Sequence, residues 1–272
     1  MSGRRLRPCL SFFRIRFLRG QQYRVAALAG VATQFFWGFM RLLAYRAFYR
    51  SDPAAIPMPL PQLAAYIWLQ QAFLALFMNW YWDEDILSAI TEGSIAYELC
   101  RPLDLYTMWF ARSAASRLAK AVLRCMPILV IAALLPPPFR LGLPASLPDF
   151  LLFLLSMLLG FSVVVTFAML IYALCFFTIS PMGVRIVAMS LMELLSGSVL
   201  PLPFLPDKLR AVLELLPFAS MQNVPLRIYA GQIAGGERAF TMALQAVWLV
   251  LLAAAGKALM NRALRRVVVQ GG

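Results

Sequence analysis

The run FLLFLLSMLLGFSVVVTFAMLIYALCFFTI, residues 150–179, carries no charged side chain along its 30 positions. About 20 apolar residues cross the hydrocarbon core of a bilayer as a helix, so this run is long enough to span it. The composition agrees, because 62% of the residues are hydrophobic and 14% are charged, whereas soluble domains carry about a quarter charged residues. The short alternating segments of a transmembrane barrel are absent, and a helix satisfies its own backbone groups in lipid. The sequence therefore predicts an all-α membrane protein.

Apolar stretches on both sides of this run extend the prediction to six transmembrane helices in a single membrane domain. They cover residues 23–45, 62–82, 105–135, 150–179, 184–200 and 239–259. Residues 1–22 combine arginines with phenylalanines and leucines, which predicts an amphipathic helix on the membrane surface rather than a disordered basic tail. The arginines interrupt the apolar part and no small-residue cleavage site follows, so we expect no cleaved signal peptide. Trp80, Tyr81 and Trp82 end the second span and predict an aromatic belt at the headgroups.

Basic residues set the expected orientation of these helices. Six spans place both termini on one side, and that side holds 17 lysines and arginines against 8 on the other. Because cytoplasmic loops are enriched in basic residues, both termini are expected in the cytoplasm. Anionic lipid also accounts for the net charge of +13, so membrane lipid is an expected partner and nucleic acid is not. Arg117, Lys120 and Arg124 share one face of the third span, and we expect them to reach headgroups rather than to bind substrate.

One segment departs from this basic composition: DEDILSAITEGSIAYELCRPLD, residues 83–104, hereafter the acidic segment. It holds six of the twelve acidic residues and a single basic residue, Arg101. Gly93 can break a helix, Ser94 can cap the next one, and Pro102 stops it. Asp104 is placed to cap the third span, so the pattern predicts a bent helix pair rather than a flexible loop. Its charge favours docking to a cytoplasmic partner over a plain solvated loop, because charge complementarity sets the register of an interface.

Polar side chains are few inside the expected spans, and they carry much of the functional information. Glu193 lies midway in the fifth span, where a carboxylate is either part of a transport path or buried beside a partner. Gln70, Gln71 and Asn79 in the second span fit a pathway lining, although amides between packed helices more often hold the helices together. Two glycines, Gly160 and Gly197, are expected to allow close helix approach.

Several kinds of chemistry are excluded by residues that the sequence lacks. It has no histidine, the commonest general base and metal ligand, and no GxxxxGK[ST] loop to cradle nucleotide phosphates. Its four cysteines lack metal-ligand spacing, so no metal site, cofactor or disulfide is expected in this chain. Two functions other than transport are the alternatives. An intramembrane enzyme using Glu193 with Ser190 or Ser196 lacks a suitable base. A passive scaffold or channel is the second alternative.

Prolines break residues 201–231 too often for a single span. Leu209, Val212, Leu213 and Leu216 nevertheless line one face of a short helix. This pattern predicts a re-entrant or surface-lying helical hairpin between the fifth and sixth spans.

Two motifs resemble those of a known family, the ABC (ATP-binding-cassette) type-2 exporter permeases. Within the acidic segment, ITEGSIAYELCRPLD resembles the glycine, short helix and L-x-R-P pattern that follows the second span of these permeases. The stretch LSGSVLPLPFLPDKLRAVLELLPFASMQNVPLRIYAGQ resembles their second signature; the matching residues are Pro201, Phe204, Leu205, Pro206, Leu216, Pro217, Phe218, Pro225, Ile228, Tyr229 and Gly231. The likeness follows the span order along essentially the whole chain, and it points to a bacterial subgroup in which two permeases accompany one ATPase.

The resemblance implies a permease subunit of the bacterial inner membrane that pairs with a second permease, identical or paralogous. It also implies two cytoplasmic ATPase subunits, which bind ATP and Mg²⁺. The acidic segment would contain a coupling helix seated on the ATPase, with contact residues Glu92, Gly93, Ile95, Tyr97, Glu98 and Arg101. The N-terminal amphipathic helix would be a connecting helix, and residues 201–231 would be re-entrant helices that close the exit. The motifs do not indicate the transported substrate.

Overall fold

The computed structural model describes residues 3–22, 24–51, 56–78, 82–101, 103–144, 146–178 and 180–266, and these ranges contain helices but no strand. The helices are α1 (Gly3–Gly20), α2 (Arg24–Ser51), α3 (Leu60–Ala72), α4 (Leu74–Phe77), α5 (Glu84–Thr91), α6 (Ile95–Leu99), α7 (Leu105–Leu134), α8 (Leu147–Cys175), α9 (Pro181–Leu195), the 3₁₀ helix η2 (Leu202–Phe204), α10 (Asp207–Leu215), α11 (Pro217–Met221), α12 (Asn223–Tyr229) and α13 (Gly235–Leu264). The all-α prediction is confirmed.

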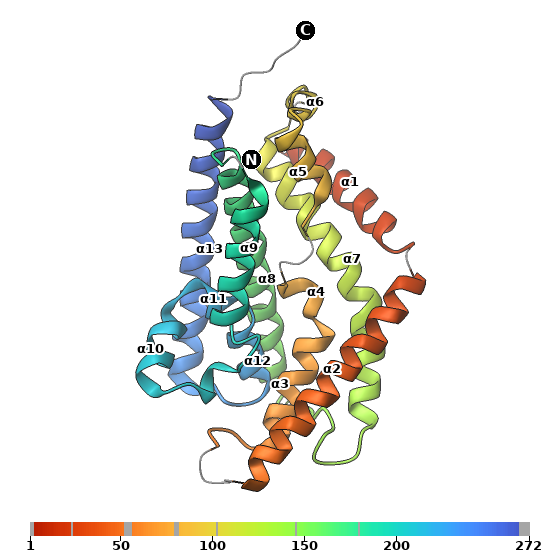
Figure 1. Cartoon of the computed structure of the whole chain (residues 1–272), viewed down its shortest axis with the longest axis vertical. Helices are drawn as coiled ribbons and strands as arrows, with labels where there is room; N and C mark the ends of the chain where they lie inside the picture. Colours follow the sequence, from red (N-terminus) through yellow and green to blue (C-terminus); the bar gives the residue numbers. More distant parts are fainter. Residues whose placement is uncertain are drawn as a thin grey trace.

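Four long helices, α2, α7, α8 and α13, run lengthwise through the molecule (Figure 1). Helices α5 and α6, the start of α7 and the end of α13 lie at the upper end in this view, hereafter the α6 end. Near the same end α1 lies beside α7, and both α1 and α2 pack against α7. The end of α2 and the loop after α7 lie at the opposite end.

Within the described residues, three helices are long and apolar enough to cross a membrane: α2 from Ala27 to Ser51, α8 and α13. They correspond to the first, fourth and sixth expected spans. The second expected span is not one helix, because the backbone at Phe73 (φ −102°, ψ 16°) separates α3 from the four-residue α4. The 15-residue α9 is about 22 Å long at 1.5 Å per residue, shorter than the roughly 30 Å of a hydrocarbon core. The six-span topology therefore stays a prediction.

Helix α8 is the centre of the bundle and packs against α11, α12 and α13. Gly160 allows this packing, because a Cβ atom at that position would lie 2.2 Å from the backbone oxygen of Met221 in α11. Its expected role in close helix approach is confirmed. Gly197 serves a different purpose: it follows α9 in a turn with a positive φ of 78°, close to the Tyr66 hydroxyl.

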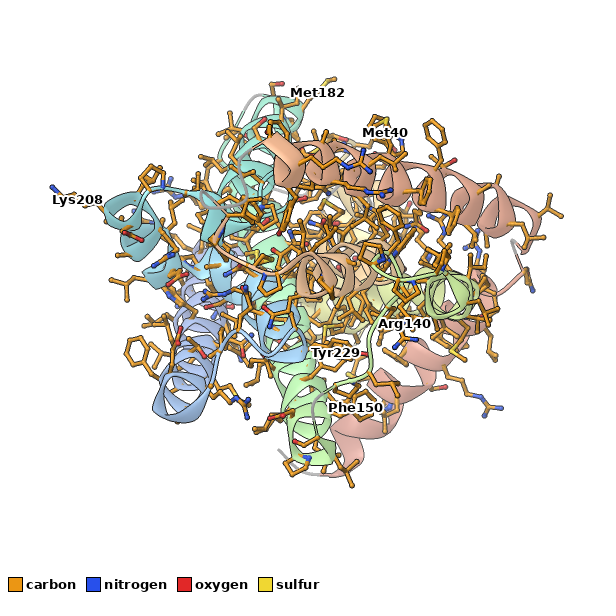
Figure 2. All side chains as sticks on the ribbon, turned by 90° about the horizontal axis from the view of Figure 1, so that it is seen from below. Met40, Arg140, Phe150, Met182, Lys208 and Tyr229 are labelled. Carbon is orange, nitrogen blue, oxygen red and sulfur yellow. The ribbon has the colours of Figure 1, made fainter. Side chains whose placement is uncertain are left out.

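Residues 201–231 fold as η2 followed by the three short helices α10, α11 and α12. Tyr229 of α12 lies within the bundle and donates a hydrogen bond to the Gly142 backbone oxygen at 3.0 Å, whereas Lys208 of α10 projects away from it (Figure 2). The expected apolar face of α10 is only partly packed against this chain, since Leu213 is buried but Leu209 and Val212 are exposed. A series of short helices is thus present, and its re-entrant placement stays a prediction.

Candidate functional site

The acidic segment bends at Gly93, between α5 and α6. This glycine takes a positive φ of 75°, a conformation that favours glycine because a Cβ atom would be strained there. At the end of the segment, the Asp104 carboxylate accepts a hydrogen bond from the Thr107 backbone N–H at 3.0 Å, so its expected capping of the third span is confirmed. Ser94 precedes α6 without a side-chain capping hydrogen bond, so the expected cap at that position is wrong.

Arg112 of α7 is the residue around which the acidic segment is assembled. Its guanidinium donates to both carboxylate oxygens of Asp83, from Nε at 2.5 Å and from an Nη at 2.6 Å. It also pairs with Asp85 and, at 3.4 Å, with Glu98. Only 3% of the Arg112 side chain is exposed, and a cation so deeply buried requires paired, hydrogen-bonded carboxylates. Because Glu98 also accepts a hydrogen bond from the Trp109 indole, α6 is fixed to α7.

Two further ion pairs hold the acidic segment to neighbouring helices. Arg16 of α1 contacts Asp85 at 3.2 Å, and Arg185 of α9 contacts Glu84 at 3.0 Å. These carboxylates make contacts inside the chain, but the Asp85 and Glu84 side chains are still 64% and 71% exposed, so docking through the acidity of the segment as a whole stays a prediction. Its sequence does not reveal these contacts, because each basic partner lies on another helix.

A second group of exposed residues surrounds α6 and is hereafter the tip; its members are Thr91, Glu92, Gly93, Tyr97, Leu99, Cys100 and Arg101. Tyr97 is exposed over 79% of its surface. Four of the six expected contact residues belong to this tip. The other two, Ile95 and Glu98, are turned inward, because Ile95 is buried and Glu98 is bound by Arg112. They position the tip rather than face a partner.

A second candidate site is a cavity of about 400 Å³ between α2, α3 and the end of α9, hereafter the amide pocket. Its lining combines the polar residues Thr33, Gln34, Arg41, Gln70, Gln71, Glu193 and Ser198 with the apolar residues Trp37, Leu74, Met78 and Val199. The structure therefore brings together Gln70, Gln71 and Glu193, the three residues expected to line a pathway. Glu193 reaches the amide pocket from the last turn of α9, and not from the middle of a span as expected.

Arg41 organises one wall of the amide pocket. It donates hydrogen bonds to the Gln70 side-chain oxygen at 2.7 Å and to the backbone oxygens of Ser198 and Val199 at 2.7 and 2.6 Å. Gln70 in turn donates to the Ser198 oxygen at 3.0 Å. This amide thus holds α3 to the turn after α9, a role that amides often have between packed helices.

Gln34 and Glu193 are the groups of the amide pocket that stay open to a ligand. Gln34 is 4% exposed, and its amide nitrogen and oxygen both lack a hydrogen-bond partner in the described part of the chain. Glu193 forms none of the ion pairs found among the described residues. Buried polar groups are nearly always hydrogen-bonded, so an unpartnered amide lining a cavity marks a position for a polar ligand or water. Sequence reasoning missed Gln34 and Arg41, although their i, i+7 spacing puts them on one face of α2.

A family model described as ABC-2 family transporter protein matches residues 35–271. The chain belongs to the ABC-2 transporter family. The match covers the whole acidic segment and helices α3 to α13, and it confirms the resemblance carried by the two motifs. ABC-2 permeases are generally non-catalytic membrane transport components, and they typically work with an ATPase partner. Neither a curated protein nor a solved structure matches the chain significantly.

Two expectations about the membrane surface of this ABC-2 permease are corrected by the structure. Arg117 is 2% exposed and donates to the Met78 backbone oxygen at 2.7 Å, where the end of α4 leaves carbonyls without helical partners. It therefore does not reach headgroups. Trp82 is buried and packs edge-on against Tyr172, so it is not part of an aromatic belt. Asn79, Trp80, Tyr81 and Pro102 lie outside the described residues.

Proposed function

We propose that this ABC-2 permease is the membrane subunit of an ATP-driven exporter, and that the tip of the acidic segment docks on a cytoplasmic ATPase. The observation that carries the proposal is the contrast between the tip and its base. Tyr97 projects from α6 with 79% exposure, while Arg112 holds the base in the bundle with 3% exposure. Tyrosine and arginine dominate the binding energy of protein interfaces, and Tyr97 and Arg101 supply both at the tip.

The ion pairs at the base give the tip a rigid connection to α7. Glu98 joins α6 to Trp109 and Arg112, and Asp83 joins the start of the segment to the same arginine. A movement of the tip together with the ATPase therefore displaces α7, because the contacts of Glu98 with Trp109 and Arg112 join α6 to α7 directly. ATP and Mg²⁺ act in the ATPase subunits, whose closure drives alternating access in a pair of permeases. The second permease is a copy of this chain or a paralogue.

The amide pocket is the proposed part of the translocation path within one subunit. Gln34 and Glu193 supply an amide and a carboxylate beside apolar side chains, a combination that suits an amphipathic substrate with hydrogen-bond donors. On the outer side, residues 201–231 act as the re-entrant hairpin that closes the exit, with the motif residues Pro201, Phe204, Pro206, Pro217, Tyr229 and Gly231. The α6 end and both termini face the cytoplasm of a bacterial inner membrane, as the distribution of basic residues favours.

Purification of the tagged full-length chain from its own host in mild detergent tests this proposal. We expect an ATPase to co-purify, and we expect its ATP turnover to fall when the tip carries Tyr97→Ala with Arg101→Ala. Phe48→Ala, at the opposite end of the bundle, is the matched control. A chain that purifies without an ATPase would be a channel if it conducts ions in a planar bilayer, and a scaffold if it does not. The enzyme alternative gains no support, because neither Ser190 nor Ser196 lines the amide pocket with Glu193.

A further inference from the structure

A separate cavity of about 380 Å³ lies at the junction of α1, α2 and α7, hereafter the basic cavity. The side chains that define its chemistry are Arg16, Arg19, Ser113, Ser116, Lys120 and Arg124. None of these residues lines the amide pocket or belongs to the tip of the acidic segment. The basic cavity is therefore a site distinct from the amide pocket and from the tip, although Asp83 and Glu84 of the acidic segment complete its lining.

Two glycines bring α1 and α2 close enough to α7 to enclose the basic cavity. A Cβ atom at Gly20, the last residue of α1, would lie 2.6 Å from Cβ of Ala119. A Cβ atom at Gly30 in α2 would lie 2.7 Å from the guanidinium carbon of Arg124. Both distances are shorter than real contacts of a Cβ atom, so a side chain at position 20 would push α1 away from α7, and one at position 30 would displace the Arg124 guanidinium. The basic cavity is thus built into the packing of three helices.

Positive charge dominates the lining of the basic cavity. Four cations line it, Arg16, Arg19, Lys120 and Arg124, together with the two acidic residues Asp83 and Glu84. Both carboxylates also have partners outside the lining, and one of the four cations, Arg16, pairs with Asp85. Asp83 is bound by Arg112, and Glu84 is bound by Arg185. Like charges held close together in a partly enclosed space destabilise one another, and a bound anion relieves that repulsion.

We propose that the basic cavity binds a phosphate-bearing anion, supplied by the headgroup of an anionic phospholipid. Arginine and lysine bind phosphate oxygens through charge-assisted hydrogen bonds. The hydroxyl groups of Ser113 and Ser116 are additional donors for the same oxygens. The position fits a headgroup, because an amphipathic helix such as α1 lies at the boundary between headgroups and acyl chains, and Arg16 and Arg19 come from its last turns.

Apolar side chains also form part of the lining of the basic cavity. They are Ala27 of α2, Trp82 before α5 and Leu123 of α7. A lipid whose phosphate contacts the cations can place the start of its acyl chains against these side chains. A soluble phosphate would leave this apolar surface unused, which is why we assign the phosphate to a lipid.

Native mass spectrometry of the full chain, extracted from vesicles of phosphatidylglycerol and phosphatidylcholine, tests the proposal. The wild-type chain is expected to retain phosphatidylglycerol preferentially. Arg19→Gln with Lys120→Gln is expected to lower that retention at least about tenfold, because each basic residue near an anionic headgroup adds to the attraction. Arg16 is left unchanged because it also pairs with Asp85. The matched control is Arg14→Gln with Lys257→Gln, which removes two exposed cations from α1 and α13 and is expected to leave retention unchanged.

Three results would overturn the proposal: equal retention of the two lipids by the wild-type chain, equal loss in the two double variants, or no loss in either. Lys120→Arg keeps the charge and is expected to keep the lipid. Thermal unfolding in detergent checks that the double variant Arg19→Gln with Lys120→Gln folds. If the double variant does not fold, the single variant Arg19→Gln is measured in its place. Inorganic phosphate added to lipid-free protein gives the remaining comparison. If phosphate at millimolar concentration binds the wild-type chain and displaces phosphatidylglycerol, the cavity binds a soluble anion. That result would overturn the proposal that a lipid headgroup supplies the phosphate.

Discussion

Arg112 and Asp83 form a bidentate ion pair, with donor–acceptor distances of 2.5 and 2.6 Å, that joins α7 to the first residue of the acidic segment. The pair is largely shielded from water, since the arginine is 3% and the aspartate 12% exposed. It explains how a segment rich in carboxylates becomes a support for a small exposed tip. The stability of the segment therefore depends on one buried cation.

Replacing Arg112 should lower the unfolding free energy of the protein. Arg112→Leu leaves the Asp83 and Glu98 carboxylates buried without their partner, so we expect a loss of about 3–5 kcal/mol of unfolding free energy. Arg185→Leu is the matched control, because its partner Glu84 is 71% exposed and such pairs contribute about 0–1 kcal/mol. Thermal unfolding of both variants in the same detergent measures the difference. Similar melting temperatures for the two variants would show that Arg112 does not hold the segment.

Because α8 packs closely on α11, Gly160→Ala should destabilise the protein more than Gly183→Ala does. Gly160→Ala places a methyl group 2.2 Å from the Met221 backbone oxygen, and the helices have to separate, at a cost of about 1–3 kcal/mol. Gly183→Ala in α9 has no heavy atom within 4 Å of the new methyl group, so we expect it to be neutral or slightly stabilising. The melting temperatures of the two variants check this, and an unaffected Gly160→Ala protein would refute the packing.

Water access to the amide pocket is the third expected outcome. In a protein whose four native cysteines are replaced by serine, Glu193→Cys should react with a membrane-impermeant methanethiosulfonate, because a translocation path admits water. Its labelling rate should change when the ATPase is trapped with vanadate. Leu158→Cys, exposed on α8 away from its ends and within a helix apolar enough to span the membrane, is the control and should stay unlabelled. Equal labelling at both positions would remove the amide pocket from the path.

Local sequence rules predicted much of this fold. The uncharged run 150–179 corresponds to α8, Leu147–Cys175, because length and apolarity alone decide a spanning helix. The bend at Gly93 and the cap at Asp104 followed from the conformational freedom of glycine and from the hydrogen-bonding reach of a short carboxylate side chain. Each of these inferences involves residues within a few positions of one another.

Contacts between distant helices could not be predicted in the same way. The sequence shows six carboxylates in the acidic segment, but nothing in their spacing indicates that Arg112, Arg16 and Arg185 bind four of them from three other helices. The break at Phe73 has no glycine or proline to signal it. The amide pocket depends on α2, α3 and the end of α9 meeting, so the sequence could single out Glu193 only as an isolated carboxylate, and it gave no reason to single out Gln34.

Site-specific photocrosslinking from the tip tests the central claim most directly. The photoreactive amino acid p-benzoylphenylalanine replaces Tyr97 in one protein and Phe48, exposed near the end of α2 at the opposite end, in another. The account predicts a covalent adduct with the co-expressed ATPase from position 97 and none from position 48. An adduct from position 48 with none from position 97 would contradict it.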